Sequence, residues 1–155
     1  MKEKRVKLFI SLLAISMVVL IGACDKETGL EKENAAIQAY LDENNITIEP
    51  QYSGLYFIET KKGTGASADG GDLCKVKYMG TFLNGEEFDS GVYEFTLGIG
   101  KVIQGWDEGI SYMNEGGKAT LLIPSSLGYK ATGSISGSIP GYTPLLFEVE
   151  LIDVN

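Results

Sequence analysis

Few residues in this sequence can carry proton transfer or covalent catalysis. The chain of 155 residues has no histidine, the side chain that most often serves as general base and as metal ligand. Ser90, Ser125 and Ser126 therefore have no histidine to activate them as nucleophiles. The adjacent carboxylates Asp107 and Glu108 fit a solvated helix face better than an acid–base pair. The sequence thus predicts neither nucleophilic nor metal chemistry, and no cofactor.

Phosphate-bearing ligands are also disfavoured. The glycines of residues 98–101, Gly-Ile-Gly-Lys, suggest a phosphate loop, but a dinucleotide fingerprint needs glycine where Ile103 stands. A P-loop needs serine or threonine where Val102 stands. The net charge is −8, and it becomes −11 without residues 1–23, which carry four basic side chains and one acidic one. An acidic protein lacks the cations that neutralise nucleic acid phosphates, so we expect no nucleic acid partner.

The single tryptophan marks the place where a pocket is expected. Ile103, Trp106 and Ile110 follow the spacing that puts them on one face of a short helix. Most of the surrounding sequence predicts strands, so this helix has only the concave side of a sheet to pack against. If the indole forms the floor of a cavity instead of filling it, the protein has an apolar pocket.

The hydrophobic pattern predicts one α+β fold, a twisted antiparallel sheet of about five strands wrapped around that helix. Asn84-Gly85 is the strongest hairpin turn in the chain, and Ser90-Gly91 is expected to interrupt the strand that follows. A long loop covers residues 125–144. The stretches that alternate or are rich in strand-forming residues are 55–59, 73–83, 86–89, 93–97, 118–123 and 145–154.

The N-terminus has the features of a secretion signal. Residues 1–7 are basic, residues 8–21 are apolar, and Gly22-Ala23 precedes Cys24. The stretch 20–24, Leu-Ile-Gly-Ala-Cys, resembles a bacterial lipobox, which implies cleavage before Cys24 and lipid on its sulfur. The alternative is an ordinary secreted protein with a chance cysteine at the cleavage site. We therefore expect a lipid-anchored protein of the bacterial cell envelope, periplasmic or surface-exposed.

Three segments follow from this pattern: a signal peptide at 1–23, a tether at 24–50, and a domain at 51–155. The tether contains one amphipathic helix, at about residues 31–44, because Ile37, Tyr40 and Leu41 recur at helical spacing. This helix lies outside the domain in sequence. We expect it to dock on its own domain as a lid or brace, and dimerisation is the alternative.

The residues of the predicted domain resemble the motifs of a known family. Successive stretches, in order and spacing, look like the motifs of FKBP-type peptidyl-prolyl cis/trans isomerases, and with the lipobox the chain is similar to the cell-envelope lipoproteins of that family. The match runs from about Gly54 to the C-terminus. The stretches are Val-Lys-Tyr-Met-Gly at 76–80, Asn-Gly-Glu-Glu-Phe-Asp-Ser at 84–90, Phe-Thr-Leu-Gly at 95–98, Val-Ile-Gln-Gly-Trp-Asp-Glu-Gly at 102–109, Ile-Pro at 123–124, Leu-Gly-Tyr at 127–129 and Leu-Phe-Glu-Val-Glu-Leu at 146–151.

The resemblance implies a role for each matching position. Trp106 would form the floor of a proline pocket, and the backbone N–H of Ile103 and the hydroxyl of Tyr129 would bind substrate carbonyls. Asp89 would lie near the twisting amide and hold Tyr78. The family would bind proline-containing polypeptides and macrolide ligands. The positions that match its active-site lining are Tyr78, Phe88, Asp89, Val102, Ile103, Trp106, Tyr129, Ile139 and Phe147, with Tyr93 where phenylalanine is usual.

The sequence departs from the family pattern near the pocket. The segment 91–93 after Asp89 is short and lacks a basic residue, Lys130 replaces a common glycine, and Ser138 replaces an apolar residue. These changes bear on turnover and macrolide affinity. The main alternative to an isomerase is a non-catalytic peptide-binding or chaperone module that uses the same pocket, and a structural spacer is a third.

Overall fold

The computed structural model describes residues 28–155, so the expected signal peptide and Cys24 lie outside the described residues. Within this range none of the helices combines the length and hydropathy needed to cross a bilayer. The elements in chain order are α2 (Gly29–Glu43), β1 (Tyr56–Lys61), β2 (Leu73–Thr81), β3 (Glu87–Thr96), α3 (Gln104–Ser111), β4 (Lys118–Ile123), the 3₁₀ turns η1 (Ser125–Leu127) and η2 (Lys130–Thr132), and β5 (Leu145–Val154).

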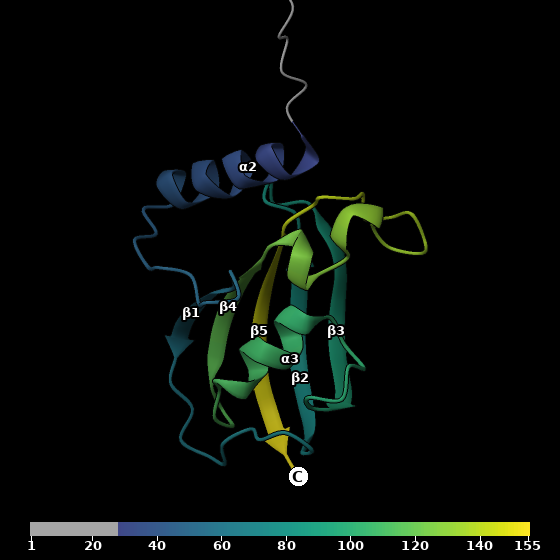
Figure 1. Cartoon of the computed structure of the whole chain (residues 1–155). Coiled ribbons are helices and arrows are strands. Elements are labelled where there is room, and N and C mark those ends of the chain that lie inside the picture. The colour runs from purple at the N-terminus through teal and green to yellow at the C-terminus, as the bar shows by residue number, and fades with distance from the viewer. Residues whose placement is uncertain (1–27) are drawn as a thin grey trace, which may run out of the picture.

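The five strands form one antiparallel sheet in the order β1-β4-β5-β2-β3, with α3 packed on one face (Figure 1). The predicted sheet and helix are confirmed. The predicted break at Ser90-Gly91 is wrong, because β3 runs through both residues as one strand. Ser90 pairs with Met79 and Gly91 with Tyr78, so the continuous partner strand β2 keeps the ladder in register.

Two glycines let α3 lie directly on β4. A Cβ at Gly105 would stand 2.6 Å from Ile123 Cγ2, and one at Gly109 would stand 2.7 Å from Leu121 Cδ2. Larger residues would push the helix off the sheet. The close approach buries Trp106 and Ile110 against the inward-facing residues of the strands. The helix therefore lies close enough to the sheet for Trp106 to pack against the strands.

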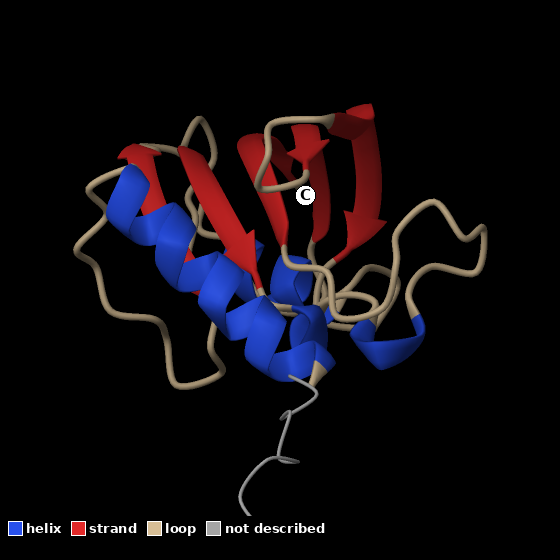
Figure 2. Ribbon diagram, turned by 90° about the horizontal axis from the view of Figure 1, so that it is seen from above, coloured by secondary structure: helices blue, strands red, loops and turns tan. Residues whose placement is uncertain are grey.

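Helix α2 packs across one end of the sheet (Figures 1 and 2). It starts at the N-cap Thr28, whose side chain accepts from the Glu31 backbone while the Glu31 carboxylate accepts from the Thr28 backbone. Ile37 and Leu41 are buried against Leu122 on the outer face of β4. The helix is thus docked on its own domain, as expected from the spacing of its apolar residues.

Candidate active site

A cavity of about 430 Å³ opens between α3, the strands β2, β3 and β5, and the loop after β4. It is lined by Tyr78, Phe88, Asp89, Tyr93, Lys101, Val102, Ile103, Trp106, Tyr129 and Phe147. Every residue that the sequence placed in the pocket lines this cavity except Ile139. Ile139 is buried in the apolar cluster that also contains Trp106 and Phe147 and is not among the residues that line the cavity.

Trp106 forms the floor of the cavity and is only 5% exposed. The rings of Tyr78 and Phe147 pack against it with ring centroids 5.1 and 5.3 Å away, in the T-shaped arrangement that aromatic rings favour. Its indole Nε1 is buried and has no hydrogen-bond partner among residues 28–155. Unpaired buried donors are rare in folded proteins, and functional sites are among the places where they occur.

The walls of the cavity depend on a residue without a side chain. Phe88 and Phe147 meet edge to face at 5.5 Å, and Gly80 lies beneath both rings. A Cβ at position 80 would stand 2.7 Å from Phe88 Cζ and from Phe147 Cε1. Gly80 pairs with Phe147 on β5 and with Asp89 on β3, so the central strand β2 brings the two walls together.

The polar groups of the cavity lie at its rim. The Tyr78 hydroxyl donates to Asp89 Oδ2 at 2.9 Å. Burial, followed by this hydrogen bond, raises the pKa of Tyr78 to about 12, so the phenol is neutral at physiological pH. Asp89 itself is exposed. The contact that the resemblance implied between these two residues is present in the structure.

Two hydrogen-bond donors at the rim have no partner within residues 28–155. One is the backbone N–H of Ile103, the N-cap of α3, whose carbonyl already accepts from the Trp106 backbone at 2.9 Å. The other is the hydroxyl of Tyr129, which lies between the turns η1 and η2. Both donors belong to residues that line the cavity.

Asp107 has a structural role that the sequence did not reveal. It was expected on a solvated face, but its two carboxylate oxygens accept from the backbone N–H groups of Gly98 and Gly100 at 2.9 and 3.1 Å. These bonds hold the turn that leads into Val102 and Ile103. Among residues 28–155, no group of three or more Cys, Asp or Glu side chains is placed to hold a metal ion.

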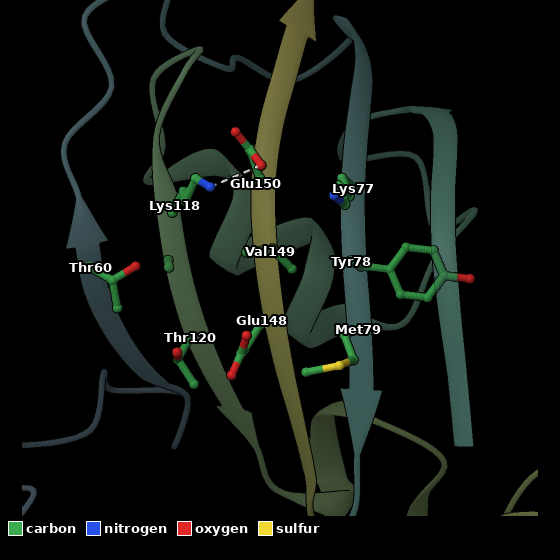
Figure 3. A pocket seen from close by; sticks show the side chains of 10 residues that line it. Thr60, Lys77, Tyr78, Met79, Lys118, Thr120, Glu148, Val149 and Glu150 are labelled. Atoms are coloured by element: carbon green, nitrogen blue, oxygen red, sulfur yellow. Dashed lines mark ion pairs between the residues drawn. The ribbon is translucent and has the colours of Figure 1, made fainter. Parts of the chain in front are cut away.

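A second cavity, of about 450 Å³, lies on the outer face of the sheet (Figure 3). Its side chains are mostly polar, and Lys118 forms an ion pair with Glu150 at 3.1 Å. Tyr78 is one of the residues that line this cavity, but its ring extends away from it, from β2 towards β3 (Figure 3). The lining of this cavity is mostly charged and hydroxyl side chains from the strands, whereas the cavity above Trp106 is lined mostly by aromatic and aliphatic side chains, so the latter is the site that can hold an apolar ring.

A family model described as FKBP-type peptidyl-prolyl cis-trans isomerase matches residues 65–152. The chain belongs to the FKBP family. The FK506-binding protein of Neisseria meningitidis serogroup B is 45% identical over 106 residues, which cover 65% of this chain and 96% of that protein. FK506-binding protein 2 of Dictyostelium discoideum is 49% identical over 90 residues, covering 55% of this chain and 67% of its own length.

Solved structures agree with this family assignment. A peptidyl-prolyl cis-trans isomerase from Pseudomonas syringae superimposes with a TM-score of 0.73 at 30% identity, covering 86% of this chain and 98% of that chain. FkpA from Escherichia coli gives a TM-score of 0.72 at 28% identity, covering 99% of this chain and 71% of its own. The molecule is therefore an FKBP-type peptidyl-prolyl cis-trans isomerase.

One lining residue of this FKBP was missed from sequence. Lys101 lines the cavity and immediately precedes Val102. Its position next to Val102 was the only indication of this role in the sequence, because an exposed lysine in a glycine-rich turn has no distinctive pattern. All the predicted aromatic residues except Tyr93 lie within one of the matched motifs. Ile139 lies in the long loop between η2 and β5, and its role in substrate binding stays a prediction.

Proposed function

We propose that this FKBP isomerises Xaa-Pro bonds of exported polypeptides in the cavity above Trp106. The observation that carries the proposal is the combination of a buried aromatic floor with unpaired donors at the rim. The proline ring would lie over the indole between Tyr78, Phe88 and Phe147, with Val102 and Tyr93 at the edges. The flanking carbonyls of the peptide would then face the Ile103 N–H and the Tyr129 hydroxyl.

The physical chemistry of isomerisation suits such a site. Rotation about the peptide C–N bond has a barrier of about 18–20 kcal/mol, because the twisted amide loses its resonance. The twisted amide also loses much of its carbonyl dipole, so an apolar cavity disfavours the planar ground state more than the transition state. Lowering the barrier by about 5.5 kcal/mol would give roughly a 10⁴-fold acceleration. No proton is transferred, so the absence of histidine is compatible with the reaction.

The polar groups would orient the substrate. The Ile103 N–H is fixed by its place at the start of α3, and the Tyr129 hydroxyl is carried by the loop between η1 and η2. Asp89 would lie beside the twisting amide and would hold the Tyr78 ring in place through the 2.9 Å hydrogen bond. These positions would bind the twisted geometry better than the planar one, which is the requirement for raising the rate.

We also propose that the protein works from a membrane, anchored by lipid on Cys24. The support is the signal-like residues 1–23 and the lipobox-like stretch that ends at Cys24. Only residues 25–27 separate Cys24 from Thr28, the N-cap of α2, so the domain would sit close to the bilayer. Replacing Cys24 by serine should abolish incorporation of labelled fatty acid and move the protein from the membrane to the soluble fraction.

The same pocket would bind macrolides of the FK506 type. The support is that relatives from Neisseria and Dictyostelium are named as FK506-binding proteins. A pocket with a buried aromatic floor would take the apolar ring of such a ligand in the place of proline. Competition between FK506 and a proline peptide, followed through the fluorescence of Trp106, would test this part of the proposal.

The decisive experiment measures catalysed cis/trans exchange of a Leu-Pro peptide by NMR, using the full chain in detergent. Asp89→Ala is compared with Glu94→Ala, which removes a carboxylate from the same strand outside the cavity. We expect clear acceleration that Asp89→Ala reduces and Glu94→Ala leaves unchanged. Peptide binding without acceleration would mean that the pocket serves a non-catalytic binding module.

A further inference from the structure

Helix α2 buries a carboxylate that its packing does not require. Glu33 is 3% exposed, although it belongs to a helix whose apolar contacts come from Ile37 and Leu41. Its Oε1 accepts from the backbone N–H of Ser125, and its Oε2 accepts from the Ser125 hydroxyl at 2.6 Å. A buried carboxylate is costly unless it is fully hydrogen-bonded, and an apolar residue would dock the helix as well. This arrangement therefore needs another explanation.

Ser125 begins the turn that carries Tyr129. The Leu127 N–H bonds to the Pro124 carbonyl at 3.0 Å, and the Gly128 N–H bonds to the Ser125 carbonyl at 2.9 Å. Residues 124–128 thus form one closed unit, and Tyr129 follows it directly. Because the Tyr129 hydroxyl has no hydrogen-bond partner within residues 28–155, its position depends on the backbone of this unit and on the packing of the Tyr129 ring against the core.

We infer that Glu33 is a positioning residue for the isomerisation reaction. It holds Ser125, and through the turn it sets where the Tyr129 hydroxyl meets a substrate carbonyl. The inference rests on the proposed role of Tyr129. Glu33 lies outside residues 65–152, the region that the family model matches. Helix α2 is then part of the working enzyme and not only a spacer between the domain and its anchor.

The geometry of the contact supports a positioning role for Glu33 over simple docking of the helix. Glu33 gives both oxygens to a single residue 92 positions away, which fixes the direction of the Ser125 backbone as well as its place. The apolar contacts of Ile37 and Leu41 lie on Leu122 and its neighbours, not on the turn. Besides its apolar contact, the helix therefore makes a separate polar contact with Ser125, and its first residue, Gly29, lies against the ring of Tyr142.

The first test compares two substitutions at position 33 in the full chain in detergent. Glu33→Ala leaves the Ser125 N–H buried without a partner, and we expect about a tenfold fall in kcat/KM for a Leu-Pro peptide. Glu33→Gln keeps an oxygen for the Ser125 N–H and an NH₂ for its hydroxyl, so activity should stay within about twofold. Equal activity of Glu33→Ala and the wild type would overturn the inference.

A double-mutant cycle separates positioning from general stability. Tyr129→Phe removes the hydroxyl that Glu33 is inferred to place, so Glu33→Ala should cause no further loss in the Tyr129→Phe background. Losses that multiply, or a Tyr129→Phe variant with full activity, would overturn the inference. The proposed catalytic site is judged separately by the wild type and Asp89→Ala, so the two can fail independently.

Two further variants keep the test informative if Glu33→Ala does not fold. Ser125→Ala removes one of the two hydrogen bonds and should lower kcat/KM by a smaller factor, again only when Tyr129 is present. Leu41→Ala loosens the same helix at its apolar contact. Retained activity in Leu41→Ala supports a specific role for the Glu33–Ser125 contact, whereas a loss as large as that of Ser125→Ala would attribute the effect to docking of the helix and overturn the inference.

Discussion

The Tyr78 hydroxyl donates a 2.9 Å hydrogen bond to Asp89 across the β2–β3 pair, while its ring packs against Trp106 in a T-shaped contact with ring centroids 5.1 Å apart. One side chain thus connects the rim carboxylate with the aromatic floor. Asp89 is exposed and Trp106 is buried, so Tyr78 spans the boundary between water and the apolar cavity. Any displacement of its ring therefore disturbs the hydrogen bond to the rim carboxylate and the packing on the aromatic floor together.

Tyr78→Phe tests this connection. The ring stays, but Asp89 loses its partner, so we expect several-fold lower kcat/KM and a loss of about 1 kcal/mol in the free energy of unfolding. The matched control is Tyr112→Phe, which removes a 2.9 Å hydrogen bond to Glu108 away from the cavity. Denaturation should show similar stability losses in both variants, and exchange NMR should show lower activity only in Tyr78→Phe. Equal activities would contradict the role of this contact.

The stability of the protein should fall steeply in alkaline solution. Burial and the Asp89 hydrogen bond raise the pKa of Tyr78 to about 12, whereas tyrosine in an unfolded chain titrates near 10. Between about pH 10 and about pH 12 the folded protein keeps a proton that the unfolded chain has lost, so this contribution is complete below pH 10 and disappears as pH rises through 12. Urea titrations of wild type and Tyr78→Phe across this range should show a shallower decline in the variant; parallel curves would refute the assignment.

Gly80→Ala should damage the walls of the cavity. The added methyl group would collide with Phe88 and Phe147 at 2.7 Å, and overpacking of this kind costs about 1–3 kcal/mol. We expect kcat/KM to fall by about tenfold or more, because the walls must move apart. Gly91→Ala is the control, since its Cβ would lie 3.8 Å from the Tyr78 ring, an ordinary contact. An active Gly80→Ala variant would show that the walls are not needed in their present place.

Lys130→Gly should stabilise the fold. Lys130 has φ of 58°, in the left-handed region that costs an ordinary residue about 1–2 kcal/mol and glycine little. The greater freedom of glycine in the unfolded chain offsets part of this gain, so we expect an increase of up to about 1 kcal/mol in the free energy of unfolding. Lys130→Ala removes the same charge but keeps the Cβ. A similar gain in both variants would point to charge and not to the backbone.

Some predictions failed where neighbours in space overrode local pattern. Ser90-Gly91 was expected to end a strand, but pairing with Met79 and Tyr78 on β2 carries β3 through both residues. Asp107 was expected to face solvent, yet it holds the Gly98–Gly100 turn, because the start of α3 lies beside that turn. In each case the deciding contact comes from another element, which no single segment of sequence records.

The sequence alone determined the sheet and the short helix, and its resemblance to the FKBP family indicated most of the residues that line the cavity. Strand alternation, the Asn84-Gly85 turn and the helical spacing around Trp106 each depend on a few adjacent residues, so they can be recognised without a structure. Only the tertiary structure decided which polar groups meet. The Glu33–Ser125 contact joins residues 92 positions apart, and the depth of Trp106 depends on glycines that let α3 touch β4. Such contacts follow from packing between elements, and packing is a property of the whole chain.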